Sequence, residues 1–161
     1  MTNNVTLRDV TDTDLAIFFE QQLDPDANHM AAFTARNPAD RDAFMAHWAR
    51  IMADDTGTIK TVLFDGHVAG TVACYIDEEF GEPEVTYWIG KEYWGKGIAT
   101  GALSEFLRIQ TTRPIYGRAA KDNIASIRVM EKCGFSIIGY GKGFANARGE
   151  EIEEVVLKRE M

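Results

Sequence analysis

The chain has 161 residues, of which 45% are hydrophobic and 26% are charged, a composition typical of a single globular domain. Its formal net charge of −8 argues against sequence-independent binding to nucleic acid or anionic lipid, because both require a positive field. The longest stretch without Asp, Glu, Lys or Arg runs from Gly66 to Ile76, too short for a membrane span of about 20 residues. The N-terminus carries neither a basic region nor an apolar run, so we expect no signal peptide and a cytoplasmic protein.

The N-terminal third predicts one short strand followed by two helices. Residues 5–8 form the strand, and Thr11, with Asp14 three residues later, is a helix start signal. After a polar connection around residues 24–26, Asn37 followed by proline is a second start signal. Each helix has one apolar face at helical spacing, made by Leu15, Phe18 and Phe19 in the first and by Phe44, Trp48, Ile51 and Met52 in the second.

The pattern changes from helical to strand spacing after Gly57. Residues 58–64 and 67–76 are rich in β-branched and aromatic side chains, and Asp65-Gly66 between them is a strong hairpin signal. The elements that follow are a strand at 84–89, a helix at 99–109, a strand at 115–119, a helix at 124–132, and a closing hairpin of 136–140 with 152–157. The helix at 99–109 has the apolar residues Leu103, Phe106 and Leu107 on one side. This order predicts one domain over residues 1–161 with a mixed α/β fold and antiparallel hairpins.

The cysteines and histidines form no metal-binding pattern. Cys74 and Cys133 each lie inside an apolar segment, and His29, His47 and His67 do not cluster near them in the sequence. We therefore expect the two cysteines to be small buried hydrophobic residues, with no disulfide and no metal.

Residues 87–100 (Tyr-Trp-Ile-Gly-Lys-Glu-Tyr-Trp-Gly-Lys-Gly-Ile-Ala-Thr) run from a strand through a glycine-rich turn into a helix. Without side chains at Gly95 and Gly97, the backbone can approach a ligand closely and direct several N–H groups at it. The start of the new helix adds its positive end, so a pyrophosphate would fit. An ordinary tight turn remains the alternative, since neither common nucleotide-binding pattern is complete here.

A second motif lies about 25 residues further along, at residues 123–135 (Asn-Ile-Ala-Ser-Ile-Arg-Val-Met-Glu-Lys-Cys-Gly-Phe). Together with the turn at 94–99, it resembles the GNAT superfamily of N-acetyltransferases, especially the ribosomal-protein acetyltransferase-like branch. The family's phosphate motif is Arg/Gln-x-x-Gly-x-Gly/Ala, and Trp94 takes the place of its leading residue. The resemblance extends from Thr71 to Phe135.

The resemblance implies an α/β (α+β) fold with a splayed central sheet, flanked by about four helices, and acetyl-CoA in the gap as co-substrate without a metal. The pantetheine arm would hydrogen-bond the edge of the strand at 84–89 as an extra strand would. The pyrophosphate would lie on the amides that follow Trp94. The residues implied as cofactor contacts are Trp88, Ile89, Trp94, Gly95, Lys96, Gly97, Ile98, Ala99, Thr100, Asn123 and Ser126.

The family reaction is direct attack of a neutral amine on the thioester, through an oxyanion, so a base or a water chain must first deprotonate an ammonium. Glu84 is the candidate base, and the alternative is an exposed glutamate after Pro83. Many relatives place a tyrosine acid where this chain has Met130, which cannot donate a proton. Ser126 is the candidate replacement, or else it caps or packs within its helix. Because Tyr87 and Trp88 alternate across their strand, we expect one to face the cleft and the other the core, with core packing as the favoured interpretation for both.

The resulting hypothesis is an acetyl-CoA-dependent N-acetyltransferase acting on a primary amine of a small molecule or peptide. A non-catalytic acyl-CoA-binding or regulatory module is the alternative, motivated by Met130. A nucleotide-phosphate binder ranks last, because the lysine-containing loop is missing. We expect no nucleic-acid or membrane partner, while a homodimer and the identity of the acceptor are left open.

Overall fold

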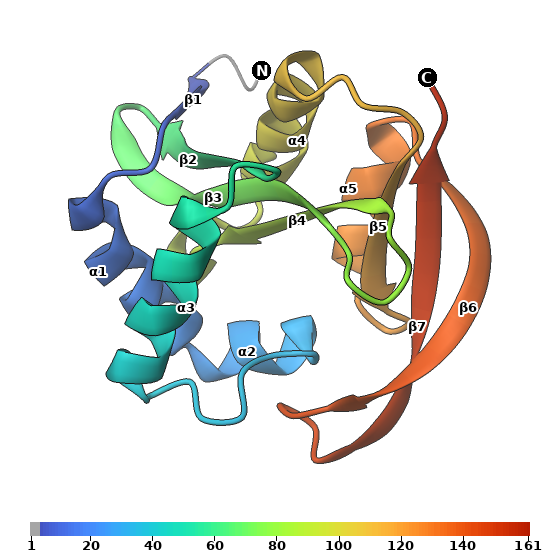
Figure 1. Cartoon of the computed structure of the whole chain (residues 1–161), viewed down its shortest axis with the longest axis horizontal. Helices are drawn as coiled ribbons and strands as arrows, with labels where there is room; N and C mark the ends of the chain where they lie inside the picture. Colours follow the sequence, from blue (N-terminus) through green and yellow to red (C-terminus); the bar gives the residue numbers. More distant parts are fainter. Residues whose placement is uncertain (1–3) are drawn as a thin grey trace.

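The computed structural model describes residues 4–161 as a seven-stranded sheet with five α-helices (Figure 1). The elements are β1 (Val5–Arg8), α1 (Asp12–Gln22), α2 (Pro25–Ala31), α3 (Arg41–Ala53), β2 (Thr58–Phe64), β3 (His67–Ile76), β4 (Pro83–Ile89), the 3₁₀ turn η1 (Lys91–Tyr93), α4 (Ile98–Ile109), β5 (Ile115–Ala120), α5 (Ile124–Lys132), β6 (Ser136–Ala145) and β7 (Glu150–Arg159). The mixed α/β class is confirmed, with one more helix than the four expected.

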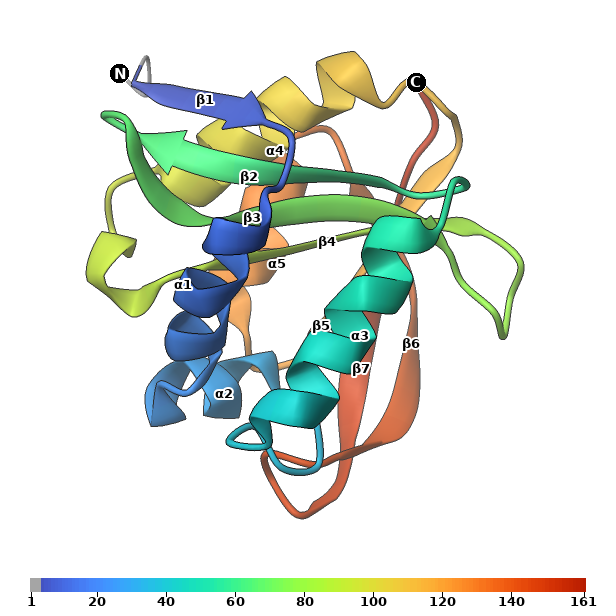
Figure 2. The ribbon, with the colours of Figure 1, turned by 60° about the vertical axis from the view of Figure 1, so that its left-hand side comes forward.

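The sheet divides into two arms at its centre. The strand order is β1-β2-β3-β4-β5-β7-β6, and β4 with β5 is the parallel pair. These two strands pair only at Glu84 and Tyr116, and they separate beyond that point. In Figure 2, β1 to β4 run across the view while β6 and β7 run down it. The predicted splay is therefore present, and its closed end lies at Glu84.

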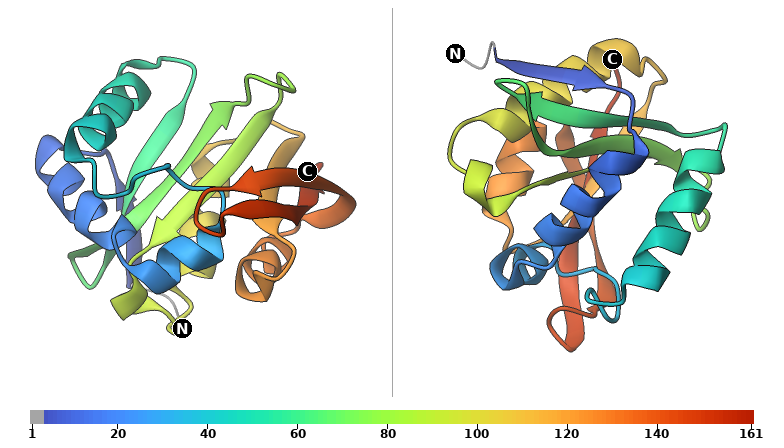
Figure 3. Two further views of the ribbon diagram at one scale, coloured as in Figure 1. Left: turned by 90° about the horizontal axis from the view of Figure 1, so that it is seen from below. Right: turned by 90° about the vertical axis from the view of Figure 1, so that its left-hand side faces the viewer.

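The helices cover the two faces of the sheet separately. In Figure 2, α1, α2 and α3 lie in front of the sheet and α4 and α5 lie behind it, and both views of Figure 3 agree. The main core fills the space between the sheet and α4 and α5. Its α4 side chains include Ile98, Leu103 and Phe106, each at most 1% exposed, which confirms the apolar face predicted for this helix.

Two details of the N-terminal helices differ from the expectation. Residues 24–26, expected as a connection, begin α2: the Asp24 carboxylate accepts hydrogen bonds from the backbone of Asp26 and Ala27, with Pro25 in the first turn. Helix α3 begins at Arg41 behind an Asp40 cap, and not at Asn37, whose side chain accepts from Ala39 N–H within a turn. Asp24 followed by Pro25 is therefore a helix start signal, although the sequence analysis assigned these residues to a connection.

The predicted hairpins are both present. Asp65 and Gly66 join β2 to β3 with φ of 51° and 81°, the left-handed conformation that such a two-residue turn requires. The closing hairpin is longer than expected, because β6 continues to Ala145 and β7 begins at Glu150. Within the described residues, no helix combines the length and the apolar character needed to cross a membrane.

The two cysteines are free thiols. Cys74 and Cys133 are both buried, which confirms them as small core residues, and burial raises the pKa of each thiol. Among residues 4–161, no group of three or more His, Cys, Asp or Glu side chains is placed to hold a metal ion.

A buried carboxylate anchors α1 to the sheet. Asp14 is 2% exposed and accepts hydrogen bonds from both terminal nitrogens of Arg8, at 2.7 and 2.9 Å, and from the hydroxyl of Thr61 at 2.7 Å. The Arg8 guanidinium holds the pKa of this carboxyl well below its usual range. At the other end of α1, the Gln21 side chain donates to Ala69 O in β3, opposite Gly90 at the end of β4. Helix α1 is thus fixed against the strands that carry the site.

Candidate active site

The glycine-rich turn, which the sequence analysis predicted as an anion cradle, lies at the open end of the gap. Gly95 and Gly97 adopt φ of 77° and 75°, a left-handed conformation that is costly for residues with a side chain. Gly97 precedes α4, whose first backbone hydrogen bond runs from Gly101 N–H to Gly97 O. The N–H groups of Ile98, Ala99 and Thr100 therefore lie in the first helical turn, where they have no partner within the helix and can bind an anion.

Trp94 connects the glycine-rich turn to the end of β4 by a hydrogen bond. Its indole Nε1 donates a hydrogen bond of 2.9 Å to Ile89 O, while 43% of the residue remains exposed. The tryptophan at the family's Arg/Gln position thus has a positioning role that the sequence did not reveal.

Replacing Trp94 with Phe should weaken acetyl-CoA binding about fivefold, the effect of losing one ordinary hydrogen bond. Calorimetry measures this affinity, and Tyr93→Phe, which removes a hydroxyl from the neighbouring residue, is the matched control. An unchanged affinity in Trp94→Phe would show that the loop keeps its position without this bond.

The backbone of β4 presents alternate residues to the gap. Gly90 N–H donates to Ala69 O, so the backbone groups of Trp88 face β3 and those of Tyr87 and Ile89 face the gap. The Trp94 indole already donates a hydrogen bond to Ile89 O. The Ile89 N–H and the backbone N–H and C=O of Tyr87 therefore remain for hydrogen bonds with an added strand. Of the two residues predicted for this edge, Ile89 therefore faces the gap and Trp88 does not.

The side chain of Trp88 lies on the opposite face of β4 from Tyr87, toward the side covered by α1 to α3. Its indole Nε1 is buried and has no hydrogen-bond partner among residues 4–161. An unpaired buried donor is costly, and the contact of Trp88 with the cofactor stays a prediction.

Asn123 and Ser126 open α5 on the other side of the gap. The Asn123 side chain caps the helix by accepting from Ser126 N–H at 3.3 Å, and it donates to Met30 O in α2 at 3.2 Å. Asn123 is thereby a link between α5 and α2, and its contact with pantetheine stays a prediction.

The hydroxyl of Ser126 lies 2.6 Å from that of Tyr87. The Tyr87 hydroxyl is also 3.2 Å from Ser126 O, so β4 and α5 are joined across the gap at this residue. Burial raises the pKa of Tyr87 to about 12. The sequence analysis assigned Tyr87 to core packing, and its ring does pack against the core, but its hydroxyl reaches the candidate catalytic serine.

Met130 fills the core where many relatives place a tyrosine. It is 1% exposed, and a Cβ added to Gly117 would lie 2.5 Å from its Sδ. The side chain therefore packs against β5 and offers no proton donor.

Glu84 belongs to a cluster of charged and aromatic groups at the closed end of the gap. Its Oε1 lies 3.1 Å from Arg118 Nε as an ion pair without hydrogen-bond alignment, and its Oε2 accepts from the Tyr75 hydroxyl at 3.2 Å. Arg118 also pairs with Glu154 at 3.2 Å, and its guanidinium lies 4.2 Å from the ring centre of Phe80. Burial raises the pKa of Glu84, and Arg118 opposes that shift. Glu84 is thus not an ordinary exposed glutamate, and its role as base stays a prediction.

Replacing Glu84 with Gln should lower the rate about tenfold at neutral pH, or about 1.4 kcal/mol of activation free energy. The defect should shrink at higher pH, where more of the amine is already neutral and needs no base. A pH–rate profile against the wild type measures this. Glu154→Gln, which also removes a carboxylate from Arg118, is the matched control. Parallel profiles for Glu84→Gln and the wild type would exclude proton removal by Glu84.

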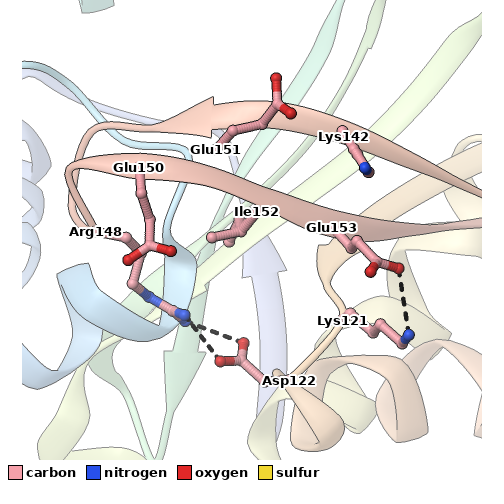
Figure 4. A pocket seen from close by; sticks show the side chains of 8 residues that line it. All are labelled: Lys121, Asp122, Lys142, Arg148, Glu150, Glu151, Ile152 and Glu153. Atoms are coloured by element: carbon pink, nitrogen blue, oxygen red, sulfur yellow. Dashed lines mark hydrogen bonds and ion pairs between the residues drawn. The ribbon is translucent and has the colours of Figure 1, made fainter.

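A cavity of about 570 Å³ lies beneath the closing hairpin, outside the predicted site (Figure 4). Arg148 in the hairpin turn forms a two-pronged ion pair with Asp122 at 2.8 and 3.0 Å and donates to His29 O in α2. Lys121 pairs with Glu153 across the same space. These contacts hold the hairpin tip and α2 together beside the start of α5. The ion pairs at the edge of the cavity therefore stabilise the elements next to the candidate site.

The comparisons with known proteins agree with this geometry. The model of the GNAT acetyltransferase domain matches residues 4–136, and the chain belongs to this family. In Bacillus subtilis (strain 168), YdaF, whose assignment as a ribosomal N-acetyltransferase is itself provisional, is 32% identical over 112 residues; the match covers 64% of this chain and 61% of that relative. This chain therefore spans less than two thirds of that relative's length.

Solved structures show the same architecture over nearly the whole chain. A crystal structure described as a probable acetyltransferase is 25% identical with a TM-score of 0.79, and it covers 98% of this chain and 93% of its own. The spermidine N-acetyltransferase of Vibrio cholerae, solved with CoA and spermine, is 20% identical with a TM-score of 0.78, and the covered shares are 98% and 96%. At that identity the second structure supports the fold alone.

Proposed function

We propose that this protein transfers an acetyl group from acetyl-CoA to a primary amine of a small molecule or peptide. The observation that carries the proposal is the splay between β4 and β5, which pair at one position only, with the glycine cradle at its open end. An extended ligand with a phosphate at one end fits this arrangement, because the free edge of β4 supplies strand-like hydrogen bonds and α4 supplies amides.

The chemistry that we propose is direct transfer. Glu84 or water first removes one proton from the ammonium, and the neutral amine nitrogen then forms a bond to the thioester carbon to give an oxyanion. As this intermediate collapses to the amide, the nitrogen loses its second proton to water. When the C–S bond breaks, its electron pair goes to sulfur, and the Ser126 hydroxyl stabilises the resulting thiolate by a hydrogen bond. The thiolate takes a proton from solvent after release. Acetylated amine and CoA are the products.

Thiol release from acetyl-CoA in the presence of an amine panel tests the proposal. The panel should contain spermidine and a peptide with an N-terminal alanine, because relatives of the fold are named for polyamine and ribosomal-protein acetylation. Amine-dependent release of CoA supports the enzyme. Binding of acetyl-CoA without release for any amine favours the non-catalytic acyl-CoA module, for which the buried Met130 at the usual acid position is the supporting observation.

A further inference from the structure

The contact between Tyr87 and Ser126 joins the two sides of the splayed gap. Tyr87 comes from β4 and Ser126 from the first turn of α5, and their oxygens lie 2.6 Å apart, shorter than the usual separation of two hydroxyls. A tyrosine hydroxyl has one hydrogen, yet Tyr87 has two acceptors within reach, Ser126 Oγ and Ser126 O.

Two hydrogen-bond arrangements are therefore available. In the first, Tyr87 donates to Ser126 O, and the Ser126 hydroxyl donates back to Tyr87. In the second, Tyr87 donates to Ser126 Oγ, which frees the serine hydrogen for another acceptor. A negative charge beside Ser126 favours the second arrangement, because the serine hydrogen can then point at that charge and each bond of the chain polarises the next.

We propose that Tyr87 is a positioning residue that turns the Ser126 hydroxyl toward the sulfur of CoA when the thiolate forms. This inference rests on the proposed function, since it assigns a residue to the leaving-group side of that reaction. Tyr87 does not act as the acid itself. Its pKa of about 12 keeps the phenol protonated over the working range, so it remains a hydrogen-bond donor throughout. This hydrogen-bond donor comes from β4, because the buried Met130 on α5 has no group that can donate a hydrogen bond.

The charge on sulfur can be probed without knowing the acceptor. The thiol of free cysteine has a pKa of roughly 8.5, and the thiol of CoA, a simple alkanethiol, ionises at somewhat higher pH. CoA therefore gains a negative sulfur as the pH rises through the alkaline range. Desulfo-CoA lacks only that sulfur and serves as the reference ligand. Cys133 is the other titratable group that acts on Tyr87, and burial raises the pKa of its thiol. The ratio of the two affinities removes the effect of protein groups that titrate in the same range.

The experiment is calorimetric binding of CoA and desulfo-CoA between pH 6.5 and about 9.5. For the wild type, we expect CoA affinity relative to desulfo-CoA to rise roughly tenfold across this range, the effect of a charge-assisted hydrogen bond. Tyr87→Phe should lose most of that gain while it binds desulfo-CoA normally. Ser126→Ala should lose it too, and the double variant should be no worse than Ser126→Ala, because Tyr87 acts through Ser126. Tyr140→Phe, on exposed β6, is the matched control.

Three outcomes would overturn the inference. Tyr87→Phe could keep the full pH-dependent gain, it could weaken CoA and desulfo-CoA equally, or its effect could persist in the Ser126→Ala background. The second result would assign Tyr87 to packing alone. If neither ligand binds the wild type, the proposed function fails with the inference, and this is readily distinguished from the other results.

Discussion

Ser126→Ala is expected to lower the turnover number about a hundredfold, while acetyl-CoA affinity changes little. Removing one donor aimed at charge that develops in the transition state typically has an effect on this order. The thioester carries no charge on sulfur, so the ground-state complex does not depend on the serine. The fold should not change, because Asn123 caps α5 through the backbone N–H of residue 126, which alanine retains.

Steady-state kinetics under conditions where chemistry limits the rate measure this effect. Ser104→Ala, which removes an exposed serine hydroxyl from α4, is the matched control and should behave as the wild type. Turnover in Ser126→Ala equal to that of the wild type would assign Ser126 to helix packing. A parallel rise in KM without loss of turnover would assign it to cofactor binding.

Gly97→Val should weaken acetyl-CoA binding by a factor on the order of thirty, and by at least about tenfold. Gly97 has φ of 75°, which a β-branched residue adopts only with strain, and it immediately precedes the first amides of α4. If the loop relaxes, the amides leave their positions; if it does not, the new side chain limits the approach of the pyrophosphate. Either way at least one hydrogen bond to a charged group is lost, at about 2 kcal/mol.

Gly81→Val provides the control for backbone strain. Gly81 has a similar φ of 68° in the connection between β3 and β4, at the opposite end of β4 from the cradle, and a Cβ there meets no atom within 4 Å. It should lower the stability of the fold but leave acetyl-CoA affinity unchanged. A folded Gly97→Val protein with wild-type affinity would remove the cradle from the proposed site.

The sequence alone predicted the features that depend on local backbone chemistry. Asp65-Gly66 specifies a two-residue turn, and Gly95 with Gly97 specifies a left-handed approach to a helix start, because few other residues adopt these conformations. The order of elements and the apolar face of α4 followed from side-chain periodicity. Helix α2 was missed although Asp24-Pro25 carried the same kind of signal that was read at Asn37.

Only the tertiary structure decided which side chains meet across the splay. Tyr87 and Ser126 are 39 positions apart, and Glu84 and Arg118 lie on the two strands that pair at one point. Strand alternation assigns Tyr87 and Trp88 to opposite faces but does not say which face each one takes, nor what lies opposite. That depends on the register of β4 against β3 and on how far β4 and β5 separate, and both are set by packing of the whole sheet against its helices.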